Sequence, residues 1–403
     1  MARLLLFTGK GGVGKTTAAA ATAALLADRG RKTLVLSTDP AHSLADALGV
    51  PLGPEPREVE TGLAALQVDA QRRFEGSWET VRGYLGELLA RAGVGGLAAE
   101  ELTVLPGAAE VVALLEVRDR VARGPWDAVV VDCAPTAETL RLLALPEALS
   151  WYVEKVFPTH RRMVRALGTG LLGGLPGLAG LGTVPLPPSG VLDAAGRLAG
   201  ELADVRALLA DPGRTAVRLV LTPESMVVAE ARRTMTTLAL FGHRVDAVVA
   251  NRVVPAGDGS DEWRSAWVAA QQRQLAEVRE SFAGVPLRLA QHRPYEPVGL
   301  PALLDVGREL YGGDDPLDSP PPAEAPAVER DGGEYVLRMP LPFTSGADVA
   351  LARSGDELVV TVGGHRRLVT LPSGLRRCET VGASVAGGAL RVRFRPDPDQ
   401  WPR

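Results

Sequence analysis

The stretch Gly9-Lys10-Gly11-Gly12-Val13-Gly14-Lys15-Thr16-Thr17 decides the fold of this chain. It lies between a short apolar run, residues 3–8, and an Ala-rich segment with helical spacing that extends to about residue 29. Residues 9–16 match the pattern G-x-x-x-x-G-K-[ST], in which glycines let successive backbone N–H groups turn toward a phosphate. A helix that follows such a loop directs the positive end of its dipole at the same anion. The stretch and its context therefore predict a phosphate-binding loop rather than a plain glycine turn.

The two lysines of this loop stand out against the composition of the chain. Only four of the 44 Lys and Arg residues are lysines, yet Lys10 and Lys15 both lie in the loop. A compact ammonium on a flexible stem suits this position better than the planar guanidinium of arginine. We expect Lys15 to reach the β and γ phosphates and the Thr16 hydroxyl to bind Mg²⁺. The alternative for Lys10 is a solvated surface lysine.

Apolar runs alternate with helical patterns through residues 1–311. Strands are expected at residues 3–8, 33–38, 63–69, 127–132, 216–222, 245–251 and 285–290. Helices are expected near residues 16–29, 139–150, 225–241, 262–282 and 299–311. This alternation is typical of a parallel sheet covered on both faces, so we predict an α/β fold of the P-loop NTPase type. Residues 70–125 and 151–212 interrupt the alternation and are predicted to be helical insertions.

The composition changes after residue 311. Residues 312–333 are rich in Pro, Ala and acidic residues, which is typical of a semi-extended linker at a domain boundary. Beyond the linker the period becomes two, and short strands are expected at residues 334–339, 348–352, 357–362, 366–371 and 389–394. Residues 334–403 are therefore predicted to form a small all-β sandwich.

Two carboxylates follow apolar strands beside the predicted loop. Asp39 comes at the end of the run at residues 33–38, and Asp132 ends the run DAVVVD. Acids at the carboxyl ends of strands next to a P-loop face the γ-phosphate crevice. Asp39 can there orient or deprotonate the attacking water, and Asp132 can serve Mg²⁺ directly or through a water. The alternatives are an N-cap of the next helix at Asp39 and a carboxylate satisfied by backbone amides at Asp132.

Composition limits the other classes of function. The net charge of −4 gives no overall attraction to nucleic acid or to anionic lipid. The two cysteines, Cys133 and Cys378, are far apart and have no metal-ligand spacing. The N-terminal apolar run is shorter than a signal-peptide core, and no uninterrupted apolar stretch is long enough to span a bilayer. We expect a cytoplasmic protein without a nucleic-acid partner, and its single P-loop means that two nucleotide sites require two chains.

Four motifs in order carry a resemblance to a known family. They are GKGGVGKTT at residue 9, DPAHSL at residue 39, DCAPTAETLRLL at residue 132 and VVANRV at residue 248. Over residues 1–311 the chain resembles the family of arsenite-pump ATPases and tail-anchored-protein targeting ATPases. The resemblance implies hydrolysis of ATP with Mg²⁺ by a homodimer joined through its nucleotide face.

The resemblance also implies roles for single residues. Lys10 matches the signature lysine of the deviant loop, which acts on the nucleotide of the partner subunit. Asp39 matches the catalytic switch I aspartate, and Asp132 begins switch II. Asn251 matches an asparagine that reads adenine, because an amide can pair with both the ring nitrogen and the exocyclic amine. Glu224 matches a second nucleotide-side position more weakly; the alternative for both is capping of a strand end.

The chain departs from the family pattern in three places. Residues 252–311 contain no cysteine for a C-x-x-C zinc clasp, so dimerisation must rest on other surfaces. Two scattered cysteines do not suit a thiolate As(III) site. Ala137 and Glu138 stand where switch II usually has Gly-His, which puts the detailed motion of that loop in question.

The C-terminal module resembles an α-crystallin domain. The resemblance rests on RMPLPF at residues 338–343, DELVVTV at 356–362, HRRLVTLP at 365–372 and GGALRVRF at 387–394. Alternating strands with Gly turns are common, so the alternative is an unrelated small sandwich.

The insertion at residues 151–212 is the expected site of client binding, because the matching region of the family supplies a groove for a hydrophobic helix. The candidate groove residues are Leu167, Leu171, Leu172, Leu175, Leu178 and Leu181. The insertion could instead pack on its own domain, be disordered or make transient contact with a membrane. We expect an ATP-driven dimeric chaperone or targeting factor for hydrophobic clients. The alternatives are a partition or positioning ATPase that acts on DNA or membrane, and a subunit of a metalloid-efflux ATPase.

Overall fold

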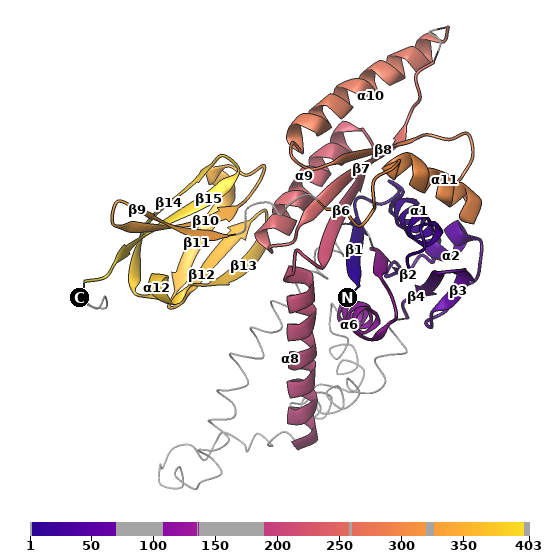
Figure 1. The fold of residues 1–403 in the computed structure, drawn as a ribbon. Helices are drawn as coiled ribbons and strands as arrows, with labels where there is room; N and C mark the ends of the chain where they lie inside the picture. Colours follow the sequence, from indigo (N-terminus) through magenta and orange to yellow (C-terminus); the bar gives the residue numbers. More distant parts are fainter. Residues whose placement is uncertain are drawn as a thin grey trace, which may run out of the picture. The chain divides into compact units, whose positions relative to one another are not determined.

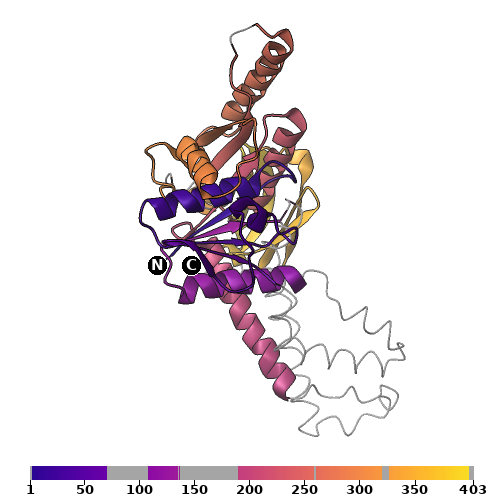
Figure 2. The same cartoon turned by 90° about the vertical axis from the view of Figure 1, so that its right-hand side faces the viewer.

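The computed structural model of the chain describes residues 2–69, 108–134, 136, 189–257, 260–319 and 326–398. The chain divides into two compact units. The first consists of residues 1–67, 125–140 and 210–403, and the second of residues 68–124 and 141–209. Figures 1 and 2 trace the elements of the chain from two directions.

The first unit is built on an eight-stranded sheet in the order β3-β4-β2-β5-β1-β6-β7-β8. The strands are β1 (Arg3–Thr8), β2 (Thr33–Ser37), β3 (Arg57–Glu60), β4 (Leu63–Gln67), β5 (Ala128–Asp132), β6 (Thr215–Leu221), β7 (Val245–Val253) and β8 (Leu287–Gln291). Neighbouring strands are parallel throughout, except that β3 pairs with β4 in the antiparallel sense. The predicted parallel α/β sheet is therefore confirmed, but the antiparallel edge strand β3 was missed. Its sequence, REVE, is polar and mostly exposed, so it lacks the apolar pattern of a buried strand.

Helices cover the two faces of this sheet (Figure 1). α1 (Lys15–Asp28) packs on β2 and β5 and against α2 (Ser43–Leu48) and α11 (Leu300–Tyr311). α9 (Ser225–Leu240) packs on β6 and against α10 (Glu262–Ser281). Most of α1 is buried, and its many alanines present little bulk between the helix and the strands. The first turn of α1 is consequently fixed at the carboxyl end of β1, where the glycine loop lies.

A buried ion pair and its hydrogen bonds connect several elements of this unit. Arg218 on β6 and Asp246 on β7 are both almost fully buried, and the Arg218 Nε lies 3.2 Å from the Asp246 Oδ1. Arg218 also donates to the Tyr311 hydroxyl at 2.7 Å, and that hydroxyl lies 2.8 Å from the Thr22 Oγ1. The network connects β6, β7, α11 and α1, and it gives hydrogen bonds to charges that would be unfavourable to bury alone.

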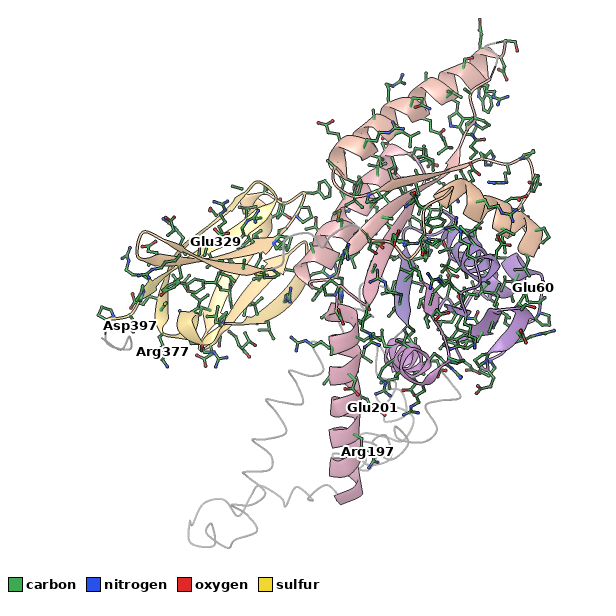
Figure 3. The ribbon with its side chains drawn as sticks, viewed as in Figure 1. Glu60, Arg197, Glu201, Glu329, Arg377 and Asp397 are labelled. Atoms are coloured by element: carbon green, nitrogen blue, oxygen red, sulfur yellow. The ribbon has the colours of Figure 1, made fainter. Side chains whose placement is uncertain are left out.

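In the second unit the structure describes two helices, α6 (Ala108–Arg123) and α8 (Ser189–Ala210, whose last residue belongs to the first unit). Arg118 of α6 lies 3.6 Å from a carboxylate oxygen of Glu201 on α8. Figure 3 shows Glu201 and Arg197 on successive turns of α8.

Both helices fall within the predicted helical insertions, residues 70–125 and 151–212. Residues 70–107 and 151–188 lie outside the described part of the chain, as does the helix expected near residues 139–150. The six candidate groove leucines, Leu167 to Leu181, are among them.

The C-terminal region forms the small antiparallel all-β module that was predicted. One sheet has the order β14-β15-β10-β9 and the other the order β11-β12-β13. The strands are β9 (Ala327–Asp331), β10 (Glu334–Pro340), β11 (Val349–Ser354), β12 (Glu357–Val362), β13 (His365–Thr370), β14 (Cys378–Ala386) and β15 (Ala389–Pro396), with a short helix, α12 (Ser373–Arg376). Buried residues of both sheets, among them Leu337, Val360 and Phe394, form its core.

Two strands of this module were not predicted. β9 lies inside the predicted linker at residues 312–333, so that segment is not linker throughout. All five residues of β9 are exposed on an edge strand, as Glu329 illustrates in Figure 3, and they carry no alternating apolar pattern. β14 was missed because its only large aliphatic residues are Val381 and Val385 and its register shifts between Thr380 and Gly382.

The end of α9 enters the core of the β module. Leu240, the last residue of the helix, is completely buried in the same cluster as the core residues of the sandwich. Its carbonyl accepts a hydrogen bond from the Arg367 guanidinium on β13. One turn earlier, the Thr236 hydroxyl donates to the Pro342 carbonyl at 2.6 Å. Within the first unit, the β module is therefore joined to the sheet by direct packing on α9.

None of the helices in the described part of the chain is both long enough and apolar enough to cross a membrane.

Candidate nucleotide site

Two glycines of the loop after β1 are required by their surroundings. Gly14 has φ +93°, in the left-handed region, and a Cβ there would lie 2.1 Å from the Asn251 Nδ2. A Cβ on Gly9 would lie 2.1 Å from the Val220 carbonyl oxygen of β6. A Cβ on Gly11 or Gly12, by contrast, would meet nothing within 4 Å, and both residues are exposed. The loop is thus packed against strand ends on one side and open to solvent on the other, as a phosphate cradle must be.

The two loop lysines differ in their environment. Lys15 begins α1 and is buried, and its Nζ donates to the Lys10 carbonyl at 3.4 Å. Lys10 is only partly exposed, and its ammonium makes no hydrogen bond or ion pair to any residue that the structure describes. Lys15 therefore lies within the loop, while Lys10 contributes a second, unpaired cation. Thr17, also named from the sequence, is half-buried in the first turn of α1.

Asp132 is the electrostatic centre of the site. Its Oδ2 accepts hydrogen bonds from the Thr16 hydroxyl at 2.8 Å and from the Ser37 hydroxyl at 3.2 Å. Its Oδ1 is buried and has no hydrogen-bond partner. Burial raises the pKa of Asp132 to about 6, although Thr16 and Lys15 act in the opposite direction. A buried carboxylate oxygen without a partner, next to the Thr16 hydroxyl, is suited to a hard divalent cation with oxygen ligands, such as Mg²⁺.

Asp39 lies two residues beyond the end of β2. Its Oδ1 accepts a hydrogen bond from the Ala41 N–H at 3.0 Å, and the Gln67 Nε2 donates to its carbonyl at 2.8 Å. The N-cap of α2 is His42, so Asp39 closes a turn and does not cap that helix. Its charge contributes, as the smallest of the named causes, to the raised pKa of Asp132, which places the two carboxylates within electrostatic reach.

Asn251 lies beside the loop at the end of the apolar part of β7. Its Nδ2 donates to the Val13 carbonyl at 2.9 Å, and its Oδ1 accepts from the Arg252 N–H at 2.9 Å. Both ends of the amide are thus used within the chain, and the residue holds the phosphate loop against β7. Glu224 is the N-cap of α9, without a side-chain cap, and is exposed, and its backbone hydrogen bonds go to Thr222 and Val228 rather than to the loop.

Sequence reasoning missed two residues that complete the site. Ser37 ends β2 and bonds both Asp132 and the Asp39 N–H, the latter at 3.2 Å. Gln67 ends β4 and binds the backbone of the same turn. Each is a polar residue at the end of an otherwise apolar strand, a signal that could have found both. Of switch II, Ala134 and Thr136 are buried, and residues 135, 137 and 138 lie outside the described residues.

Residues 2–312 match the family described as anion-transporting ATPase, and residues 332–394 match the HSP20-like domain found in ArsA. The chain belongs to the ArsA ATPase family. It is therefore an enzyme that binds a nucleotide and hydrolyses ATP, and its C-terminal module is the HSP20-like domain of that family.

Several relatives of this ArsA-family ATPase match over nearly the whole chain. A Chlorobaculum tepidum protein named "Putative arsenical pump-driving ATPase" is 37% identical, over 97% of this chain and 96% of its own length. A Streptomyces coelicolor protein without an assigned function is 40% identical, over 100% and 99%. A Paracoccidioides lutzii protein named ATPase GET3 is 29% identical, over 70% of this chain and 82% of its own. The match to GET3 thus leaves almost a third of this chain uncovered.

Proposed function

We propose that this ATPase works as a Mg²⁺-dependent homodimer, driven by ATP, that binds hydrophobic client segments and hands them over. The observation that carries the dimeric part of the proposal is the difference between the two loop lysines. Lys15 is buried in the loop, whereas Lys10 is partly exposed and its ammonium is unpaired within the described residues. A second chain brought against this face would find a free cation there, able to offset the charge that develops during phosphoryl transfer.

The other residues of the site support the same reaction. The backbone amides of residues 9–16 and the Lys15 ammonium would hold the phosphates, and Asp132 and Thr16 would hold Mg²⁺. The metal supplies charge neutralisation at the phosphate oxygens. Asp39 has one oxygen fixed by the Ala41 N–H. The other is then oriented to accept a proton from, or align, a water molecule.

Mixing two inactive variants tests whether Lys10 acts across the dimer. Lys10→Ala and Asp39→Asn should each lower turnover on the order of 10³-fold while ATP binding persists. In a mixed dimer, the Lys10→Ala chain keeps its own Asp39 and receives Lys10 from the partner. Mixing should therefore restore up to about half of the wild-type rate per mixed dimer. Lys32→Ala, at an exposed lysine outside the loop, is the control and should retain full activity.

No recovery on mixing, with both variants shown to bind ATP, would contradict action in trans. Retained hydrolysis in Asp39→Asn would show that a different carboxylate aligns the water.

The client part of the proposal rests on the sequence of residues 151–212, where leucines and glycines dominate without charge from residue 167 to 190. Burial of each leucine against an apolar helix would gain roughly 1.5–3 kcal/mol, so a few contacts suffice to hold a client segment. A fluorescent 20-residue apolar peptide should bind in one nucleotide state and be released in the other. Leu171→Asp combined with Leu175→Asp should abolish that binding without loss of ATP hydrolysis. Peptide affinity that is the same in both nucleotide states and in the double variant would contradict the proposal.

The name of the Chlorobaculum relative makes metalloid efflux the second candidate function. As(III) is held by exposed thiolates that converge on one point. Cys133 follows β5, Cys378 begins β14 in the HSP20-like module, and both are buried, each with its thiol donating to a backbone carbonyl. The proposal therefore expects no stimulation of ATP hydrolysis by arsenite, and a several-fold stimulation that disappears in Cys133→Ala would favour efflux instead.

A further inference from the structure

Large exposed apolar side chains follow the carboxyl ends of three strands of the main sheet. Five such residues in the described part of the ATPase region form what is here termed the carboxyl-edge surface: Met226, Trp263, Trp267, Tyr295 and Val298. Each follows the carboxyl end of a strand, Met226 after β6, the tryptophans after β7, and Tyr295 and Val298 after β8. The phosphate loop follows β1 at the same edge. Single exposed apolar residues are ordinary, but a set confined to one edge is typical of an interaction surface.

The two tryptophans are the largest part of this surface. Trp263 and Trp267 stand one turn apart at the start of α10, with their rings edge to face at a centroid distance of 4.9 Å. They are 69% and 46% exposed. Further along the same stripe of α10, Gln271, Leu275 and Val278 are buried, so the tryptophans continue that stripe beyond the part of the helix that packs on the fold.

Hydrogen bonds connect this helix to the phosphate loop. Asn251 binds the Val13 carbonyl of the loop. The chain then continues through Arg252 and Val254, and the buried Gln271 of α10 binds both: its Nε2 donates to the Arg252 carbonyl at 3.1 Å, and its Oε1 accepts from the Val254 N–H at 2.8 Å. The third turn of α10, one turn beyond Trp267, is thus tied by Gln271 to the segment that directly follows Asn251.

We propose that Trp263 and Trp267 form the central contact through which a second copy of this chain is held on the nucleotide face. This inference rests on the proposed dimeric function and names the residues that stabilise the dimer. The choice of a second copy follows from continuity: the unpaired Lys10 and the tryptophans lie at the same edge of the sheet, so one partner surface that reaches Lys10 also meets the tryptophans.

The surface area of the two indoles is too small to hold a dimer by itself. Covering both indoles would bury roughly 200 Å² on each chain, whereas a stable interface buries about 800 Å² per partner. The tryptophans are therefore anchors within a larger contact that includes the nucleotide loops. We expect a dimer that requires both the tryptophans and bound nucleotide.

The residues around the pair favour a protein partner over a bilayer. A helix that lies in a membrane interface needs a continuous apolar face. Beyond Trp267, the exposed residues of α10 include Gln272, Arg273, Arg279 and Glu280, so the apolar face ends after one turn.

Sedimentation of the full-length protein with Mg²⁺ and a non-hydrolysable ATP analogue tests the proposal. The wild type should dimerise, and acrylamide quenching of tryptophan emission should fall as it does so. The double variant Trp263→Ala/Trp267→Ala should bind the analogue as a monomer and raise the dimer dissociation constant at least about 100-fold. Trp263→Phe/Trp267→Phe should recover most of the affinity, and Val328→Ala, an exposed residue of the β module, should match the wild type.

Three results would overturn the proposal. The first is a wild-type dimer that the double alanine variant forms equally well, which leaves the dimeric function intact. The second is protection of the tryptophans by lipid vesicles while the protein stays monomeric. The third is a wild type that binds the analogue but never dimerises, which would also remove the dimeric function proposed above. Circular dichroism and analogue affinity of the alanine variant identify any loss of folding. If folding is lost, the dimer affinity of the phenylalanine variant decides whether the aromatic rings hold the dimer.

Discussion

Asp132 ends β5 with one carboxylate oxygen bonded to the Thr16 and Ser37 hydroxyls and the other buried without a partner. Burial alone makes the charged form unfavourable, which is why its pKa is raised to about 6. The same charge is what a divalent cation would need. The buried carboxylate thus lowers the stability of the nucleotide-free protein and is available to bind a metal ion, and such perturbed groups are common at functional sites.

The raised pKa of Asp132 predicts a particular dependence of stability on pH. Between pH 3.8 and about 6 the folded protein binds this proton more tightly than the unfolded chain does, so its contribution to the free energy of unfolding falls as pH rises through that window. The loss amounts to about 3 kcal/mol at most. Urea unfolding of the nucleotide-free Asp132→Asn variant should show it to be more stable than the wild type at pH 7. At pH 4 the difference in the free energy of unfolding between the two proteins should be smaller. Asp305→Asn, at an exposed position of α11, should follow the wild-type profile; the same profile in Asp132→Asn would contradict the account.

Asn251 supports a second prediction, because its amide already bonds the Val13 carbonyl. Asn251→Ala removes that support and leaves the carbonyl unsatisfied, which should weaken nucleotide binding about 5- to 30-fold, from a loss of about 1–2 kcal/mol. If the residue only holds the loop, affinity for ATP and GTP should fall equally. If it also reads adenine, as the family resemblance implies, ATP should lose more. Calorimetric titration with both nucleotides separates the two roles.

At the scale of elements, β6, β7, α1 and α11 meet at the buried Arg218–Asp246 pair. Arg218 is 2% exposed, and besides Asp246 it bonds Tyr311 and the Pro316 carbonyl. An ion pair so enclosed contributes little net stability, but removal of one partner leaves an uncompensated charge.

Asp246→Ala should therefore lower the free energy of unfolding by about 3–5 kcal/mol. The double change Arg218→Met/Asp246→Leu should recover much of that loss, because apolar side chains of similar volume remove both charges together. Chemical denaturation of the three proteins measures both effects. A loss in Asp246→Ala below about 1 kcal/mol would mean that water reaches Arg218.

Prediction from sequence succeeded where an element has a local pattern. β1, β2 and β5 are short runs of buried apolar residues, and their predicted bounds agree with the structure to within one residue. β3 and β9 failed because polar edge strands lack that pattern. The site divides in the same way: the glycine loop is visible in its own spacing, but the bond from Asn251 to Val13 joins residues 238 positions apart and exists only once β7 lies beside the loop.

At the scale of the whole molecule, α9 belongs to both the ATPase fold and the β module of the first unit. It begins directly after β6 and ends at Leu240 in the sandwich core. Phe282, which follows α10, adds an edge-to-face contact with Phe343 of the module, with a centroid distance of 5.5 Å. The module is thus packed onto the ATPase fold by apolar contacts as well as by hydrogen bonds.

Leu240→Ala should uncouple the unfolding of the two parts. The lost burial and the cavity should lower stability by about 2–5 kcal/mol, and the module should then unfold at lower urea than the ATPase fold. Leu238→Ala, equally buried in α9 but outside the sandwich core, is the matched control and should lower stability without a separate transition. Denaturation followed by both circular dichroism and near-ultraviolet absorbance distinguishes one transition from two.

The insertion of Leu240 into the sandwich also has an evolutionary consequence. A gene fragment that stops before the module would encode a protein in which Leu240, at the end of α9, is exposed to solvent. Such a protein should aggregate. Loss of the module in evolution would therefore favour substitution at this position. ArsA-family sequences that lack the module should carry a polar or small residue where this chain has Leu240.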